Sequence, residues 1–206
     1  SLMSSPGQEI GSVLNALAGG YVRPTSGGDP VMNPMILPTG RNMFAVNAEE
    51  TPSAVAWEKG KTLADNTLAM YREAHGDSLP RKVSYTLWSS EFIETEGATI
   101  AQVLYMLGVE PVRDPFGRVT DLRLIPSEQL GRPRIDVVVQ TSGQLRDLAA
   151  SRLFLITRAV KMAAEADDKE FPNYVAEGVV ESERHLVNRG VTPREARELS
   201  LSLIHI

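Results

Sequence analysis

Residues 130–147 read LGRPRIDVVVQTSGQLRD, and this stretch indicates the fold. Positions 135–139 are apolar except for Asp136, as expected for a strand that is buried on both faces. A short polar turn follows, and apolar residues then recur at helical spacing from Leu145 to Ala163. A buried strand that passes through a small-residue turn into a helix is the repeating unit of parallel α/β sheets.

A second unit of the same kind lies upstream. Apolar and polar residues alternate from Val83 to Trp88, which is the period of a strand, and WSSEFIETEG at 88–97 leads into a helical pattern that stops at Gly108. The predicted fold class is therefore α/β, with a mostly parallel sheet covered by helices. Two further short strands are predicted at 109–113 and 119–125.

Four segments are expected along the chain. Residues 1–50 should hold a short helix at about 8–18 and an extended loop rich in proline and glycine. Residues 51–168 should form the α/β domain, and residues 169–199 a helical segment. Residues 200–206 resemble vector-derived sequence, and we expect them to be a non-native tail.

The boundaries of the helices carry their own signals. Residues 21–52 contain five prolines and three glycines, so no regular structure is predicted there. Thr51 is predicted to cap the following helix, with Pro52 at its first position, and this helix should run to about Ala74. Near the C-terminus a helix is predicted at about 174–188, and Thr192 should open another with a capping box.

The composition excludes several classes of protein. The chain has 206 residues, a formal net charge of −5 and no cysteine. Disulfides, thiolate nucleophiles and cysteine-ligated metals are therefore excluded. A negative charge argues against a nucleic-acid partner, and no apolar run approaches the ~18–20 residues of a membrane span. We expect a soluble, cytoplasmic protein without nucleic acid and without a membrane span.

The sequence contains neither a complete phosphate-binding loop nor a histidine pattern typical of a metal site. The Gly-Lys-Thr at 60–62 resembles the end of a phosphate-binding loop, but that motif needs a glycine where Val55 stands. The three histidines are isolated from one another in the sequence, so no metal site is predicted.

Three carboxylates, Glu91, Glu94 and Glu96, follow the strand that ends near Trp88. One interpretation is that they complement the dipole of the next helix, with Thr95 or Glu96 as its cap. The other is a carboxylate cluster that attracts a divalent cation or takes protons from a bound ligand.

Arg132, Arg134 and Arg146 surround the strand at 135–139, and Ser142 offers a turn with free backbone N–H groups. They could form a pocket for an anion or carboxylate. Alternatively, Arg146 pairs with Asp136 or Asp147 and only holds the turn.

The extended loop ends in LPTGRN at 37–42. Proline and glycine would fix the backbone so that Arg41 and Asn42 point in one direction. Packing of the loop over the sheet edge explains the prolines, but it does not explain this pair.

Several strings occur in an order that resembles the large subunit of the cobaltochelatase and magnesium-chelatase family. They are GGDP and LPTGRN within 27–42, WxxExIxTEG at 88–97, QVLYMLGV at 102–109, GRV at 117–119, LGRPRIDVVV at 130–139 and SGxxRD at 142–147. The family's subunit is far longer than this chain, so the chain is interpreted as a fragment. Ser89-Ser90 and Gln144-Leu145 depart from the residues usual in the family.

The resemblance implies a subunit that binds a tetrapyrrole and inserts a metal ion into it. It implies AAA+ ATPase partner subunits that use ATP and Mg²⁺, and no cofactor bound in this stretch. Cobalt insertion into a corrinoid is favoured because Glu96 resembles the cobalt branch. Catalytic roles are expected for Glu91, Glu94 and Glu96, and substrate contacts for Arg41, Asn42, Arg132, Ser142, Arg146 and Asp147.

A His-Gly-Thr-His-Gly-type motif, which the resemblance associates with the insertion site, is absent from these 206 residues. The isolated chain is therefore not expected to insert metal. Three alternatives stay open: magnesium insertion into protoporphyrin, a docking domain without catalytic residues, and a free-standing α/β enzyme for a small anion.

Overall fold

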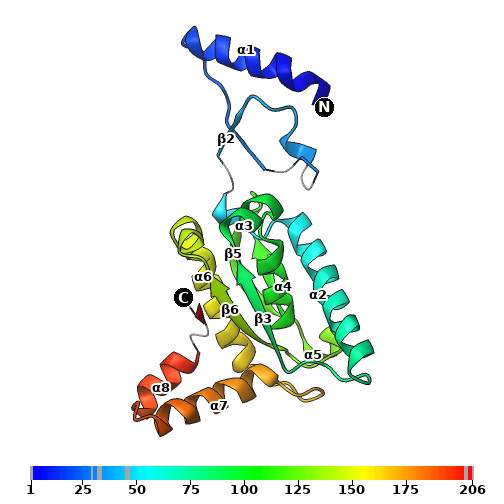
Figure 1. Ribbon diagram of the computed structural model, residues 1–206, viewed down its shortest axis with the longest axis vertical. Helices are drawn as coiled ribbons and strands as arrows, with labels where there is room; N and C mark the ends of the chain where they lie inside the picture. Colours follow the sequence, from blue (N-terminus) through cyan, green and yellow to red (C-terminus); the bar gives the residue numbers. More distant parts are fainter. Residues whose placement is uncertain (1, 29, 32–33, 45–46, 202–203, 206) are drawn as a thin grey trace.

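The computed structural model describes residues 2–28, 30–31, 34–44, 47–201 and 204–205. Figure 1 shows an α/β body, and an N-terminal unit of residues 2–44 that projects from one end of it. The N-terminal unit contains the turn η1 (Leu2–Ser4), the helix α1 (Ser5–Leu17), the strand β1 (Thr25–Ser26), the turn η2 (Pro34–Ile36) and the strand β2 (Asn42–Phe44).

The body is built on a parallel sheet, as the sequence predicted. Strands β3 (Lys82–Leu87) and β6 (Asp136–Thr141) pair in parallel along their whole length, and β6 also pairs with β7 (Ile204–His205). On one side, α4 (Ala98–Met106) contacts β3 and β6, and α2 (Ala54–Ala74) packs against α4. The helix α6 (Gly143–Ala164) also contacts α4 and lies beside the sheet in Figure 1.

The core lies between these elements. Aliphatic side chains from α4 meet those of β6 and α6 without solvent contact, and burial of such side chains is the main force that stabilises the body. Its largest fully buried members include Phe92, Leu104, Met106, Ile135 and Ile156.

The strands predicted at 109–113 and 119–125 exist, but they do not extend the parallel sheet. β4 (Val109–Arg113) and β5 (Val119–Leu124) pair with each other as an antiparallel hairpin. The connection of residues 114–118 is too short for the crossover that parallel strands need. A short helix, α5 (Ser127–Leu130), then leads back to the sheet.

The predicted cap of α2 is wrong by two residues. Ser53 caps the helix, and its Oγ accepts a hydrogen bond from the Ala56 N–H at 3.1 Å. Thr51 is extended instead, because its hydroxyl donates to the Ala48 carbonyl in the turn η3 (Ala48–Glu50). The Thr51 hydroxyl is therefore hydrogen-bonded to the preceding turn and does not cap α2.

The prediction of no regular structure between residues 21 and 52 is also wrong in part. β1 and β2 pair in parallel, and η2 and η3 are single turns of 3-10 helix. The amide of Asn42 holds this arrangement, because its Nδ2 donates to the carbonyls of Ser26 at 2.6 Å and Ile36 at 3.3 Å. The side-chain amide of Asn42 thus supplies hydrogen-bond donors in a segment whose prolines have no backbone N–H.

The C-terminal helices are where the sequence placed them. Asn173 caps α7 (Tyr174–Asn188), and Thr192 caps α8 (Pro193–Ser200). The Thr192 cap is confirmed, because the Glu195 N–H donates to Thr192 Oγ1, and the Glu195 carboxylate accepts from the Thr192 hydroxyl instead of the Thr192 N–H of a full capping box. The expectation of a non-native tail at 200–206 stays a prediction, and residues 202, 203 and 206 lie outside the described part.

The Gly-Lys-Thr at 60–62 lies in the middle of α2, where Gly60 allows close packing on α4. A Cβ on Gly60 would lie 2.4 Å from the Ala101 Cβ and 2.9 Å from the Ala98 carbonyl oxygen. Gly60→Ala is therefore expected to lower the free energy of unfolding by about 1–3 kcal/mol, although alanine is the better helix former. Urea unfolding measures this change.

Two variants control for effects other than crowding. Gly11→Ala adds the same methyl group to α1, where nothing lies within 4 Å, and should not destabilise the chain. Adding Ala101→Gly to Gly60→Ala should recover part of the loss. If Gly60→Ala were as harmless as Gly11→Ala, the helices would not be in close contact.

Candidate functional site

The parallel strands β3 and β6 end at the same edge of the sheet, below the N-terminal unit (Figure 1). The turns that follow them are tied together: the Ser142 N–H donates to the Leu87 carbonyl at 3.2 Å, and the Ser89 hydroxyl donates to Gln144 Oε1 at 2.7 Å. The short helix α3 (Ser89–Thr95) begins here, as does α6. Ligands of open α/β sheets bind at this carboxyl edge.

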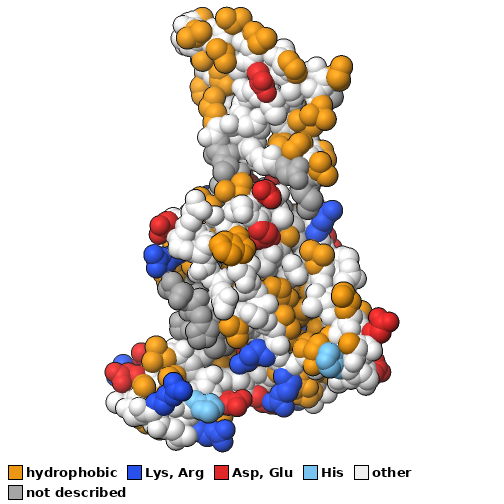
Figure 2. Space-filling view, in the orientation of Figure 1, with side chains coloured by type: hydrophobic (Ala, Val, Ile, Leu, Met, Phe, Trp, Pro, Cys, Tyr) orange, Lys and Arg blue, Asp and Glu red, His pale blue; other side chains and the backbone are white. Residues whose placement is uncertain are grey.

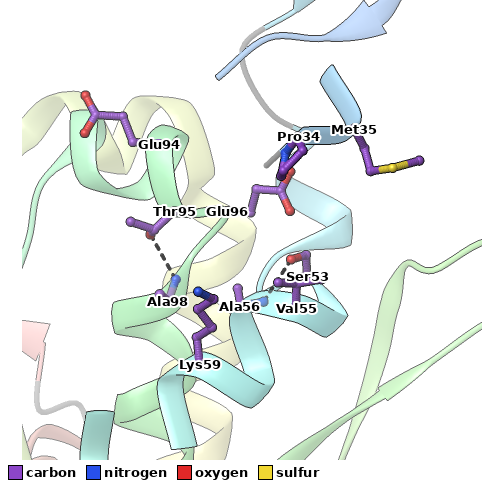
Figure 3. A pocket seen from close by; sticks show the side chains of 10 residues that line it. All are labelled: Pro34, Met35, Ser53, Val55, Ala56, Lys59, Glu94, Thr95, Glu96 and Ala98. Atoms are coloured by element: carbon purple, nitrogen blue, oxygen red, sulfur yellow. Dashed lines mark hydrogen bonds between the residues drawn. The ribbon is translucent and has the colours of Figure 1, made fainter. Parts of the chain in front are cut away.

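A pocket of about 130 Å³ lies next to this edge, where α3 meets α4 (Figure 3). Its walls come from η2, the first turns of α2, the end of α3 and the start of α4. Most of the lining is apolar, with one ammonium and two carboxylates among it. The lining residues are Pro34, Met35, Ser53, Val55, Ala56, Lys59, Glu94, Thr95, Glu96 and Ala98.

The charged side chains of the pocket point in different directions. In Figure 3 the carboxylate of Glu96 lies beside Pro34, above the start of α2, and Lys59 extends from α2 toward Ala98. The carboxylate of Glu94 points away from both. Of the three predicted carboxylates, Glu96 is therefore the one placed to meet a ligand in this pocket.

The backbone of Glu96 is in the left-handed region, with φ 54° and ψ 33°. Its carbonyl accepts a hydrogen bond from the Ser53 N–H at 3.1 Å. The next residue, Gly97, has φ 87°, and a Cβ there would lie 3.3 Å from atoms of Thr51 and Pro52. A left-handed non-glycine residue costs roughly 1–2 kcal/mol, and such residues cluster at functional sites.

Glu91 has a structural role that the sequence left open. Its Oε1 accepts hydrogen bonds from the hydroxyls of Thr95 and Thr99, both at 2.8 Å, and from the Thr99 N–H at 3.3 Å. The carboxylate therefore sits at the first turn of α4, as dipole complementarity predicts. Thr95 accepts from the Ala98 N–H at 3.1 Å in the same turn, whereas Glu96 is the left-handed C-cap of the preceding helix α3.

Arg113 and Arg152 hold the turn that precedes α2, and sequence reasoning missed both. Arg152 donates to the Thr51 carbonyl at 3.1 Å and to Glu49 Oε2 at 2.8 Å, and Arg113 donates to the Pro52 carbonyl at 2.5 Å. Burial lowers the pKa of each arginine. One signal was present for Arg152, which is a charged residue inside the apolar stripe of α6.

Arg132 does not join Arg146, so the predicted arginine pocket around β6 is wrong. Arg132 precedes β6, whereas Arg146 follows it, and the strand separates them. The guanidinium of Arg132 lies on the ring of Tyr105 and donates to the carbonyls of Tyr105 at 2.7 Å and Pro133 at 3.0 Å. It lines a separate cavity of about 360 Å³ at the opposite edge of the sheet.

The turn after β6 is held by its own residues. Ser142 caps α6, because its Oγ accepts from the Leu145 N–H at 3.2 Å. Arg146 is half exposed, and its Nε lies 3.7 Å from Asp147 Oδ1. The alternative pairing of Arg146 with Asp136 is wrong, since Asp136 binds Lys82 at the other end of the strand.

Arg41 belongs to the N-terminal unit. It lines a cavity of about 330 Å³ with α1 residues and Tyr21, and Asn42 beside it is engaged by backbone carbonyls. Arg41 and Glu96 therefore line different cavities, and Arg146 lines neither of the two.

Two negative findings concern only the part of the chain that the structure describes. There, no three His, Asp or Glu side chains come together as metal ligands would. Within the same residues, no helix has both the length and the apolar character needed to cross a membrane.

The buried carboxyl group of Asp136 should make the stability of the fold depend on pH. It is 1% exposed, with Lys82 Nζ at 2.8 Å, and burial raises its pKa despite this ammonium group. An acid with a raised pKa stabilises the fold below its unfolded pKa, and this contribution is lost as the pH rises through the folded pKa. Asp136→Asn should therefore improve stability more at about pH 7 than at about pH 4.

Urea unfolding at both pH values measures this difference between Asp136→Asn and the parent. Lys82→Met is the matched control: it removes the ammonium but leaves the buried carboxyl, so it should reduce stability most at the higher pH. Equal shifts of Asp136→Asn at both pH values would contradict the expectation.

The parallel sheet, with a pocket and the left-handed backbone of Glu96 beside its carboxyl edge, defines an α/β domain. Residues 1–204 match the family model described as CobN/Magnesium Chelatase, and the chain belongs to this family. The resemblance seen in the sequence is thereby confirmed.

Individual relatives and a solved structure agree with this assignment. The chain is 45% identical over 188 residues to "Magnesium-chelatase subunit ChlH, chloroplastic" of Oryza sativa subsp. indica, covering 91% of this chain and 13% of the relative. It is 37% identical over 193 residues to "Aerobic cobaltochelatase subunit CobN" of Pseudomonas aeruginosa, covering 93% and 15%. The "Catalytic Subunit of Cobaltochelatase from Mycobacterium tuberculosis" matches with a TM-score of 0.78 and 36% identity, covering 98% and 17%. The chain thus spans about one-seventh of the length of these relatives.

Proposed function

We propose that the protein containing this chain inserts a metal ion into a tetrapyrrole ring, and that the chain forms part of the wall of the insertion site. The observation that carries the proposal is the carboxylate of Glu96, held in a left-handed corner at the carboxyl edge of the sheet. Membership in the chelatase family supports the reaction class.

The chemistry of insertion requires a proton acceptor. When the metal binds the ring nitrogens, N–H protons leave, and a positioned carboxylate can accept them. Glu96 is proposed for this role, with Lys59 of the same pocket balancing its charge. Arg146 at the exposed first turn of α6 is proposed to meet a carboxylate on the rim of the ring.

The size of the pocket limits what this chain does alone. Sites for drug-sized ligands are roughly 300–1,000 Å³, and the pocket beside Glu96 is about 130 Å³. A macrocycle would need further walls from outside these residues. The isolated chain is therefore still not expected to insert metal.

Cobalt insertion into a corrinoid is the first candidate reaction, and magnesium insertion into protoporphyrin is the second. The resemblance of Glu96 to the cobalt branch of the family favours cobalt. The matched relatives include subunits named for magnesium chelatase and for cobaltochelatase. Over this stretch the magnesium-chelatase subunit of Oryza sativa has the higher identity to the chain, 45% against 37% for the cobaltochelatase subunit of Pseudomonas aeruginosa. Carboxylate oxygens suit either ion, so the metal has to be measured.

The proposal includes partners. No phosphate-binding loop occurs in these residues, so AAA+ ATPase subunits are proposed to use ATP and Mg²⁺ and to drive the insertion step. The proposed location of the complex is the cytoplasm.

The test uses the full-length subunit with its ATPase subunits and ATP. Co²⁺ or Mg²⁺ is offered with a corrinoid or with protoporphyrin, and the change in ring absorption is followed. We expect cobalt insertion into the corrinoid. Magnesium insertion into protoporphyrin would favour the second candidate, and tight subunit assembly without insertion of either metal would overturn the proposal.

A docking domain is a second candidate function, and one observation favours it. Glu91, Arg132, Ser142 and Asn42 all bind groups within the chain rather than face a shared cavity. Capture of the ATPase subunits by this chain, unchanged by added tetrapyrrole, would support docking.

A further inference from the structure

The helix α1 presents its apolar side to solvent. Ile10, Val13, Leu14 and Leu17 follow one another at helical spacing, and each is between 58% and 80% exposed. Figure 2 shows hydrophobic side chains gathered over this end of the molecule. We call these four residues the α1 stripe. Contiguous exposed apolar surface usually marks an interaction site.

The opposite, polar side of α1 is the side that packs on its own chain. The Thr39 N–H donates to Ser5 Oγ at 3.0 Å, and the Thr39 hydroxyl donates to the Glu9 carboxylate. Farther along, Asn15 Nδ2 donates to the Tyr21 carbonyl at 3.0 Å. The contacts of the polar side therefore keep the α1 stripe facing outward.

Gly40 fixes the same orientation through the backbone. A Cβ at Gly40 would lie 2.7 Å from both Cα and N of Glu9, so the loop and the helix meet backbone to backbone. Gly40 also has φ 106°, which favours glycine. Rotating α1 to bury its apolar side would break this contact and the three hydrogen bonds.

We propose that the α1 stripe docks on an apolar surface elsewhere in the same large subunit. The relatives that match are about six to eight times as long as the matched stretch, which covers 13–17% of them, so most of such a subunit lies outside this chain. This inference rests on the family assignment and not on the metal or the ring.

Two other occupants fit less well. The only charged residue in α1 is Glu9, and amphipathic helices that bind anionic membranes carry lysine and arginine on their polar side. A second copy of the chain would need an interface of roughly 800 Å² per partner, and four aliphatic side chains form only a small part of such an area. An intramolecular contact needs no such area, because the two surfaces are already linked.

The test is hydroxyl-radical footprinting of the unsubstituted full-length subunit. Oxidation of Leu14 and Leu17 in the native state is compared with oxidation of the same residues in denaturant. We expect oxidation to be about tenfold slower or more in the native state, at all protein concentrations and without lipid. Oxidation at the denatured rate would overturn the proposal.

Two further results would also overturn it. Protection that disappears on dilution would assign the α1 stripe to a second copy, and protection that appears only with lipid vesicles would assign it to a membrane. As a second measurement, Leu14→Glu in the full subunit should bring Leu17 oxidation close to the denatured rate. Gln8→Glu, on the polar side of α1, should leave Leu17 protected.

Discussion

Replacing Arg134 by alanine is expected to lower the free energy of unfolding by about 3–5 kcal/mol, because it removes one partner of a buried ion pair. Arg134 is 2% exposed, and its guanidinium donates to both oxygens of Asp168 at 2.7 and 3.1 Å. It also donates to the carbonyls of Leu107, Gly108 and Ile125 at 2.6–3.1 Å. The alanine variant would leave all of these acceptors buried without that donor.

Urea unfolding followed by circular dichroism measures this loss of stability, and two further variants show whether it comes from the buried guanidinium of Arg134. Arg134→Lys keeps the charge but not the planar fork, so it should retain little of the stability. Arg123→Ala removes an exposed arginine that pairs with Glu110 at 2.7 Å across the hairpin, and should cost about 0–1 kcal/mol. If Arg134→Ala cost no more than Arg123→Ala, Arg134 would not organise the turn between α4 and β4.

The strands and most helices were predictable because their signals are local. Alternation marked β3, the apolar run marked β6, and the side-chain caps marked α8. Strand pairing was not predictable in the same way: residues 109–113 and 119–124 look like strands in either a parallel sheet or a hairpin, and only the short connection between them decides. The cap of α2 was misplaced because the Thr51 hydroxyl binds the Ala48 carbonyl, while the Thr51 carbonyl accepts from Arg152, which is distant in sequence.

The site was less predictable, for a chemical reason. The donors that recognise the carboxylates of a ligand also satisfy buried backbone carbonyls, and nearly every buried carbonyl needs such a donor. Substrate contacts by Arg132 and Asn42 stay a prediction, and in the structure both side chains donate to backbone carbonyls. Residue type and position near a strand cannot separate these two uses, whereas burial and partners can.

Glu96 differs from these residues in a way that only the structure shows. Its strained backbone is held by the Ser53 N–H and by Gly97 packed on the turn before α2. Arg113 and Arg152 hold that turn by donating to the carbonyls of Pro52 and Thr51. A carboxylate fixed from several elements is a better candidate for chemistry than one that caps a helix, as Glu91 does.

Glu96→Gln in the full-length subunit is accordingly expected to reduce the turnover of metal insertion by about 100-fold or more, the usual range for losing a positioned proton acceptor. The substitution keeps the size of the side chain and the fold of the corner, so the affinity for the ring should change little. A fall in kcat with nearly constant KM is then the expected pattern. The measurement is insertion kinetics by absorption, with tetrapyrrole binding followed separately.

Glu94→Gln is the matched control, since it removes a carboxylate of the same pocket that points away from Glu96 and Lys59 (Figure 3). It should leave turnover nearly unchanged. Glu96→Gly separates chemistry from stability: glycine accepts the left-handed backbone, so this variant should be no less stable than the parent while losing turnover. Equal turnover in Glu96→Gln and Glu94→Gln would remove Glu96 from the reaction and leave its strained backbone as a feature of folding alone.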